Sequence, residues 1–157
     1  MLKPWMIIGG VTFLVALGGL LIRPRDIPWA KHLERPNWLF FEPAIPFIWT
    51  AIFTGGAFSA LRVWQADPGS MKTWLLMGLY LLLEIVTTAY IPGTLRSRSL
   101  VVGKVLGASG LLLGILLTIS VSFIDQWAAI LLLPYVLWSP IGTYATEQMI
   151  QLNPDEA

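Results

Sequence analysis

The chain has 157 residues, of which 56% are hydrophobic and 12% are charged, and its mean hydropathy is +0.72. A soluble domain of this size needs a more polar surface, so the composition indicates an integral membrane protein. The net charge of +1 gives no reason to expect nucleic-acid binding, and the absence of cysteine excludes disulfides, thiolate catalysis and cysteine-ligated metal.

Five apolar stretches follow one another along the chain, and we predict a transmembrane helix in each, because a helix satisfies its own backbone hydrogen bonds in lipid. The stretches cover residues 5–22, 44–64, 73–91, 100–123 and 126–147. A loop rich in tryptophan and proline, residues 23–43, separates the first two, and turn residues such as Pro92-Gly93 mark later breaks. The expected fold is an all-α membrane protein, with residues 1–157 forming one domain built as a five-transmembrane-helix bundle.

Basic residues are unevenly distributed between the two ends of these predicted helices. The end with the Trp-rich loop has seven: Arg23, Arg25, Lys31, Arg35, Arg96, Arg98 and Lys104. The other end has three: Lys3, Arg62 and Lys72. Because cytoplasmic loops accumulate lysine and arginine, we expect the loop and the C-terminus in the cytoplasm and the N-terminus outside. The sequence does not identify the membrane.

Small residues recur on one face of the fourth stretch at helical spacing. They are Gly103, Gly107, Gly110, Gly114 and Thr118. Such a face lets a second helix approach closely, so it predicts either an internal contact or a homodimer seam. For the internal contact, a suitable partner is the small-residue set of the first stretch, which comprises Gly9, Gly10, Ala16, Gly18 and Gly19.

Two blocks of the sequence carry a specific pattern of proline and tryptophan. In the loop, Arg35-Pro36 is followed by Trp38 and then by Trp49-Thr50. In the last stretch, the block from Pro134 to Trp138 reads P-Y-V-L-W, and Leu152-Asn153 follows without a gap. Both blocks resemble the TspO/MBR family, the tryptophan-rich sensory proteins and peripheral benzodiazepine receptors. The resemblance covers nearly the whole chain and implies five spans and a tryptophan-rich ligand pocket.

The sequence differs from the family pattern at several positions of the loop and the helices. In the loop, Phe40-Phe41 stands for a Pro-Pro pair and Pro43 for a tryptophan. In the third stretch, Glu84 takes the place of the family's pocket asparagine and Thr87-Thr88 that of Trp-Ser, while Thr146 replaces an asparagine in the last stretch. These replacements favour an alternative function as a structural or assembly subunit that docks on a larger membrane complex.

The resemblance implies a receptor or transport protein that binds a hydrophobic planar ligand, a tetrapyrrole such as porphyrin, for sensing, sequestration or transport. Aromatic rings give flat walls for stacking, and a carboxyl group inside a span is by default a functional site. The candidate ligand-binding residues are Trp29, Trp38, Trp49, Glu84, Thr87, Tyr135, Trp138 and Thr146.

Each of these candidates also has a structural interpretation. Tryptophan is enriched at membrane interfaces, and an aromatic belt is the role we assign to Trp5, Trp64, Trp74 and Trp127. Glu84 could instead be hydrogen-bonded inside the bundle, with Thr87 and Thr88 as the expected partners.

The sequence holds no catalytic grouping that we recognise, since it lacks a second histidine, a glycine-rich phosphate loop and a serine with a histidine partner. We expect no catalytic residues, no metal ligands and no required cofactor apart from a possible bound tetrapyrrole, and an enzyme activity rests on the resemblance alone. His32 is interpreted as a solvated loop residue.

The expected partners are membrane lipid and a hydrophobic small molecule, with no nucleic acid. A homodimer and association with a larger membrane complex both stay open. Lipid or sterol handling is a further alternative, and the absence of a basic residue after Lys104 counts against it.

Overall fold

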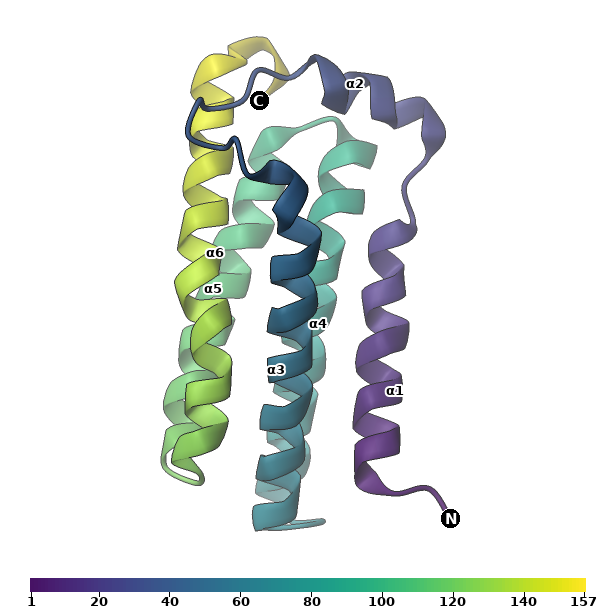
Figure 1. Cartoon of the computed structure of the whole chain (residues 1–157), viewed down its shortest axis with the longest axis vertical. Helices are drawn as coiled ribbons and strands as arrows, with labels where there is room; N and C mark the ends of the chain where they lie inside the picture. The colour runs from purple at the N-terminus through teal and green to yellow at the C-terminus, as the bar shows by residue number, and fades with distance from the viewer.

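Helices running side by side make up most of the computed structural model, which describes residues 1–157 (Figure 1). The α-helices are α1 (Pro4–Leu17), α2 (Ile27–His32), α3 (Ile45–Ala66), α4 (Met71–Ser97), α5 (Leu100–Ser122) and α6 (Gln126–Leu152). Short 3-10 turns flank these helices: η1 (Gly18–Leu20) and η2 (Pro24–Asp26) lie between α1 and α2, η3 (Glu42–Ala44) precedes α3, and η4 (Pro154–Glu156) follows α6. The structure contains no strand, so the prediction of an all-α fold is confirmed.

Four helices, α3 to α6, are long and apolar enough to cross a membrane. The predicted first span, residues 5–22, is different: its helix ends at Leu20, and the chain then bends by 56° into α2. Pro4–Leu20 alone is about 25 Å long, less than the roughly 30 Å of a hydrocarbon core. The bundle therefore has four spans, and a fifth if the bent pair of α1 and α2 is counted as one.

The break predicted at Pro92-Gly93 is wrong, because α4 continues through it to Ser97. A proline removes one backbone hydrogen bond, but membrane helices tolerate this when neighbouring groups satisfy the backbone. Here the helix continues for five residues beyond Pro92. α6 likewise runs through Pro134 and Pro140.

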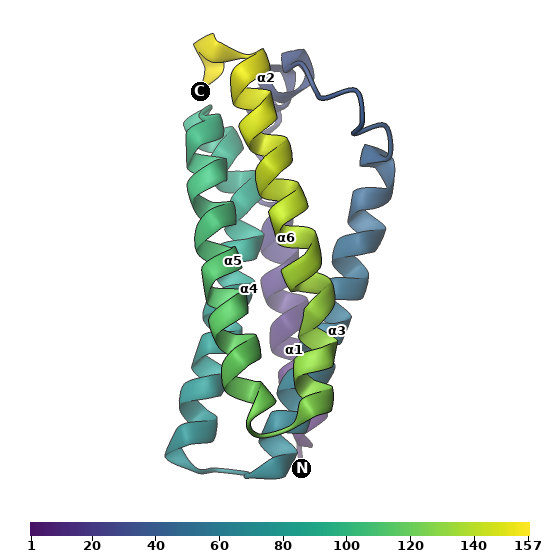
Figure 2. The ribbon, with the colours of Figure 1, turned by 90° about the vertical axis from the view of Figure 1, so that its left-hand side faces the viewer.

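The glycine face of α5 is an internal contact. α5 packs between α4 and α6, and Figure 2 shows α5 and α6 side by side over most of their length. A Cβ added at Gly114 would lie 2.5 Å from the Tyr135 ring of α6, and one at Gly103 would lie 2.6 Å from Thr94 Oγ1 of α4. These close approaches support the internal interpretation of the glycine spacing.

The partner predicted for this face, the small residues of the first helix, is wrong. α1 packs against α3 and α4 on the far side of the bundle. A Cβ added at Gly9 or Gly10 would meet no atom within 4 Å, whereas one at Gly18 would lie 3.2 Å from Thr88 Cγ2 of α4. Glycine spacing indicates a close contact but does not name the helix that makes it.

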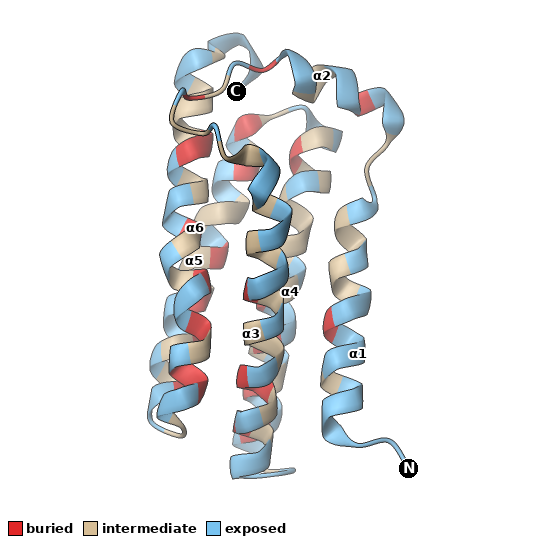
Figure 3. Cartoon of the chain, viewed as in Figure 1, coloured by how far each residue is buried: buried red, intermediate tan, exposed pale blue.

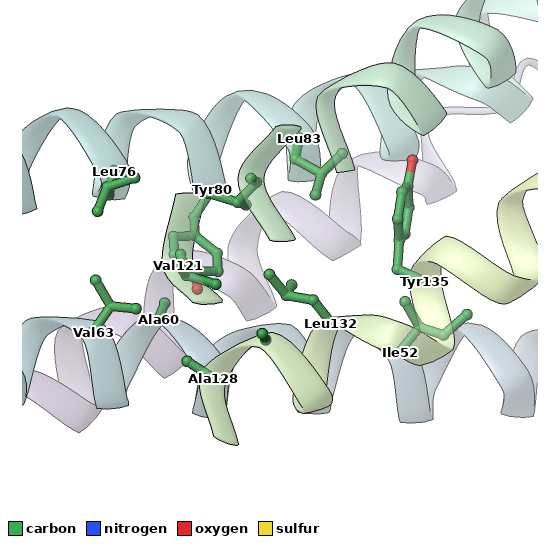
Figure 4. Close-up of a cluster of buried hydrophobic side chains, with 12 residues drawn as sticks. Ile52, Ala60, Val63, Leu76, Tyr80, Leu83, Val121, Ala128, Leu132 and Tyr135 are labelled. Carbon is green, nitrogen blue, oxygen red and sulfur yellow. The ribbon is translucent and has the colours of Figure 1, made fainter. Parts of the chain in front are cut away.

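A cluster of buried hydrophobic side chains fills the half of the bundle near the α3–α4 and α5–α6 turns (Figure 4). Val63 of α3 and Val121 of α5 are fully buried in this cluster. Ser59 Oγ donates to the carbonyl oxygen of Ala128 at 2.7 Å and lies 2.6 Å from Tyr80 Oη. Figure 3 shows that the buried residues face inward and that the outer faces are exposed, as expected for lipid-facing surfaces.

The two termini lie at opposite ends of the bundle, and the C-terminus lies at the same end as α2 (Figure 1). The tryptophans assigned to the aromatic belt gather at the N-terminal end, because they begin α1, α4 and α6 and end α3. Trp5, Trp74 and Trp127 are exposed, and the rings of Trp64 and Trp74 meet edge to face at 5.0 Å. This arrangement agrees with the belt interpretation.

Candidate ligand-binding cavity

A cavity of about 570 Å³ lies at the C-terminal end of the bundle, above the buried cluster. Nineteen of its 29 lining residues are hydrophobic. Helices α3, α4, α5 and α6 form its walls, and the loop of residues 23–43 crosses above it, so we call this loop the lid and the space beneath it the lid cavity. Its size and apolar lining are typical of small-molecule sites.

The lid is a short helix flanked by proline-rich chain. Pro28 lies in the first turn of α2, where its fixed φ suits the helix and its missing N–H costs nothing. Lys31 and His32 occupy the last turn, where positive charge is favourable. His32 is exposed, and its Nδ1 lies 2.6 Å from the carbonyl oxygen of Pro28, as expected for a solvated loop residue.

The first half of the lid is fastened to the α4–α5 turn through Asp26. Its carboxylate pairs with Arg23 at 2.7 Å and with Arg98 at 3.4 Å, although the side chain is only 1% exposed. Burial alone would raise the pKa of the Asp26 carboxyl, but the hydrogen bonds and charges of the two arginines outweigh it and hold this pKa below its ordinary value. Asp26 is therefore a charged, buried anchor.

The second half of the lid is fastened to the end of α6 through Asn153. The Asn153 side chain accepts a hydrogen bond from the backbone N–H of Glu34 at 2.8 Å and donates one to the Glu34 carbonyl oxygen at 2.9 Å. The indole N–H groups of Trp29 and Trp38 donate to Glu156 and Gln148, each at 2.5 Å. The lid is thus held to the bundle at both ends.

Aromatic rings form one wall of the lid cavity. Trp49 of α3 and Trp138 of α6 meet edge to face with ring centroids 6.5 Å apart, and Tyr135 lies 6.2 Å from Trp49. Phe41 of the lid meets Trp138 at 6.1 Å. The structure therefore brings together Trp29, Trp49, Tyr135 and Trp138, four of the predicted site residues, around one space.

A few hydroxyl groups lie among these apolar walls. Thr87 Oγ1 donates to Tyr135 Oη at 3.3 Å, and Thr146 Oγ1 is hydrogen-bonded to Tyr90 Oη. The buried Thr143 Oγ1 has no hydrogen-bond partner and packs against Gly107 of α5. Thr87 and Thr146 were predicted from the sequence, whereas Tyr90 and Thr143 were not, because nothing in their spacing separates them from ordinary helix residues.

Two predicted site residues do not line the lid cavity. Trp38 packs outside it, stacked on Tyr144 at 6.0 Å. Glu84 borders a separate space of about 30 Å³ that shares Thr87 and Tyr135 with the lid cavity. Its carboxylate accepts a hydrogen bond from Thr12 Oγ1 at 2.6 Å, so its partner is on α1 and the predicted bonds to Thr87 and Thr88 are not formed.

Comparison with known proteins decides the family. The TspO/MBR family model matches residues 7–152, which is nearly the whole chain. The chain belongs to the TspO/MBR family.

Tryptophan-rich protein TspO of Bacillus cereus is 28% identical over 157 residues, covering 98% of this chain and 99% of that protein. The tryptophan-rich sensory protein of Cereibacter sphaeroides is 27% identical over 150 residues, covering 91% and 90%. The uncharacterized membrane protein YtaB of Bacillus subtilis is 24% identical over 145 residues, covering 91% and 92%. This TspO/MBR chain is thus similar to its relatives from end to end.

Proposed function

We propose that this TspO/MBR protein binds a planar hydrophobic molecule of the tetrapyrrole class in the lid cavity, for sensing, sequestration or transport. The observation that carries the proposal is the cavity itself, about 570 Å³ of mainly apolar space walled by Trp29, Trp49 and Trp138 and covered by the lid. Binding would come from apolar burial and from stacking on the indole rings. The hydrogen-bonded hydroxyl groups of Thr87 and Tyr135 are the polar groups that would orient the molecule.

The test is a titration of the purified protein in lipid nanodiscs with protoporphyrin, followed by quenching of tryptophan fluorescence, with empty nanodiscs as the blank. We expect saturable quenching. Trp138→Ala removes one wall of the cavity and should weaken binding by about thirtyfold, as loss of a buried tryptophan anchor costs about 2 kcal/mol.

Trp127→Phe is the matched control, because Trp127 is exposed at the other end of the bundle. It should keep the affinity of the unchanged protein. Quenching that does not saturate, or that both variants weaken equally, would contradict the proposal. Co-purification of other polypeptides from gently solubilised membranes would then favour the alternative function as a subunit of a larger complex.

A further inference from the structure

The lid cavity contains an imbalance of charge. Three of its 29 lining residues are charged, and all three are in or beside the lid: Lys31, Arg35 and Glu42. The helical walls below contribute no charged residue. The charge of the lining is therefore positive by one, and it is confined to the end under the lid.

Arg35 and Glu42 neutralise each other. Arg35 Nε lies 2.8 Å from Glu42 Oε2 and 3.0 Å from Oε1, and Arg35 Nη1 donates to the carbonyl oxygen of Leu33 at 2.9 Å. The guanidinium is thus committed to partners within the lid. A ligand would have to break these bonds to use it.

Lys31 has no such partner. It is an exposed residue of α2, two positions after Trp29, and its ammonium group takes part in no ion pair or hydrogen bond within the chain. A lysine of this kind can lay its apolar stem along the cavity wall while its charged end stays at the mouth. The cavity therefore has one free cation at the lid end and apolar walls below it.

We propose that Lys31 binds a carboxylate group of the ligand, so that the molecule held in the lid cavity is a planar hydrophobic acid with its acidic edge at the lid and its apolar edge toward Tyr135. This inference rests on the proposed function and adds to it the orientation of the ligand and the residue that sets this orientation. A bond between an ammonium and a carboxylate is charge-assisted and is stronger at a partly desolvated mouth than in water.

The test compares protoporphyrin with its dimethyl ester, which keeps the ring and lacks the charges. Both are titrated into nanodiscs holding the unchanged protein, Lys31→Gln or Arg25→Gln. Arg25 is the matched control, since it is also an exposed cation of the lid but does not line the cavity. The same thermal unfolding midpoint in all three proteins would show that they are equally folded.

We expect Lys31→Gln to weaken binding of the acid by about fivefold and to leave the ester unchanged, while Arg25→Gln leaves both unchanged. The effect on the acid should shrink as salt is raised. If both compounds bind all three proteins equally, or if Arg25→Gln weakens the acid as much as Lys31→Gln, the role of Lys31 is wrong while the proposed function stands. If neither compound binds saturably, the proposed function is wrong as well.

Discussion

At the scale of single residues, the pair Thr12–Glu84 is the one side-chain hydrogen bond that joins α1 to another helix. A carboxyl group inside a span is costly unless it is bonded, and Thr12 provides that bond at 2.6 Å. Glu84 therefore holds α1 to α4 in addition to bordering the small space beside the lid cavity.

We predict an energetic coupling between these two residues. A double-mutant cycle of Thr12→Val and Glu84→Leu should give a coupling free energy of about 0.6 kcal/mol, and at most about 1.7 kcal/mol, as found for hydrogen bonds between membrane helices. Unfolding in detergent micelles measures it. Glu84→Gln should keep most of the stability, because its amide oxygen still accepts the bond.

Thr118→Val is the control for this cycle, because Thr118 Oγ1 donates within its own helix, to the carbonyl oxygen of Gly114. It should show no coupling to Glu84→Leu. Strictly additive effects of Thr12→Val and Glu84→Leu would mean that the hydrogen bond contributes nothing to stability.

The sequence shows that Glu84 is embedded in an apolar stretch, but it does not reveal its partner. We expected Thr87 and Thr88, one turn away, because local spacing can be derived without a structure. The true partner is 72 positions away in the sequence, on a helix whose place in the bundle no local pattern specifies. Lys31 is a similar case, because its lack of a partner is evident only once Arg35 and Glu42 are seen paired.

At the scale of elements, the contact of α5 with α6 depends on the absence of side chains at Gly110 and Gly114. Both glycines lie directly against the buried Tyr135 side chain: a Cβ added at Gly110 would approach its hydroxyl group, and one added at Gly114 would approach its ring. Close packing of small residues is a main source of helix association in lipid, where there is no hydrophobic drive between helices.

We predict that Gly114→Ala destabilises the protein by about 1–3 kcal/mol, since the added Cβ would lie 2.5 Å from the Tyr135 ring and force the helices apart. The midpoint of thermal unfolding in micelles measures this. Gly10→Ala is the matched control, because its Cβ would meet nothing within 4 Å, and it should be neutral or stabilising. Equal midpoints for the two variants would show that the α5–α6 contact is not tight.

The attachment of the lid to the α4–α5 turn should depend on pH through Asp26. Because its pKa is lower in the folded protein than in the unfolded chain, Asp26 contributes stability above its ordinary pKa, and that stability is lost as the pH falls through the folded value. The window therefore lies below about pH 4. Asp26→Asn should be less stable than the unchanged protein at pH 7, and the difference should vanish in strong acid.

Thermal unfolding midpoints between pH 7 and pH 2.5 test this prediction. Asp155→Asn serves as the control, because Asp155 is exposed and forms no ion pair. It should leave the profile unchanged. Profiles of Asp26→Asn and the unchanged protein that stay parallel throughout would contradict a role for the Asp26 charge.

Helix boundaries were predicted well between the second and third apolar stretches, since α3 ends at Ala66 and α4 begins at Met71, within two residues of the predicted bounds 64 and 73. They failed at Pro92, because a proline that ends a helix in water is tolerated in a membrane bundle. For the first helix the predicted end was too late rather than too early. Its apolar run continues to Ile22, but the α-helix gives way to a 3-10 turn at Gly18 before the bend into α2.

At the scale of the whole molecule, the class of fold and the polar lid follow from composition and hydropathy alone. The lid cavity does not, because its walls come from four helices and its roof from a loop, and only their assembly creates the space. Tryptophan positions illustrate this. The sequence separates the tryptophans expected at span ends from the pocket candidates, but it does not show that Trp38 packs outside the cavity while Trp29, Trp49 and Trp138 line it.

The ends of the bundle also make the direction of insertion testable. The unequal distribution of Lys and Arg favours the lid end in the cytoplasm. Because the chain has no cysteine, single cysteines give an unambiguous label. In intact cells, a membrane-impermeant maleimide should label Leu2→Cys, whereas Asp155→Cys should react only after the membrane is opened.

Pro68→Cys provides the control for this labelling, since the α3–α4 turn lies at the same end of the bundle as the N-terminus (Figure 1). It should react together with Leu2→Cys, because α3 separates the α3–α4 turn from the lid end and α1 begins at the same end of the bundle as that turn. Labelling of Asp155→Cys in intact cells, with the other two protected, would reverse the orientation and put the lid outside. Ligand would then reach Lys31 from the outer solution, so the same experiment decides which compartment supplies the lid cavity.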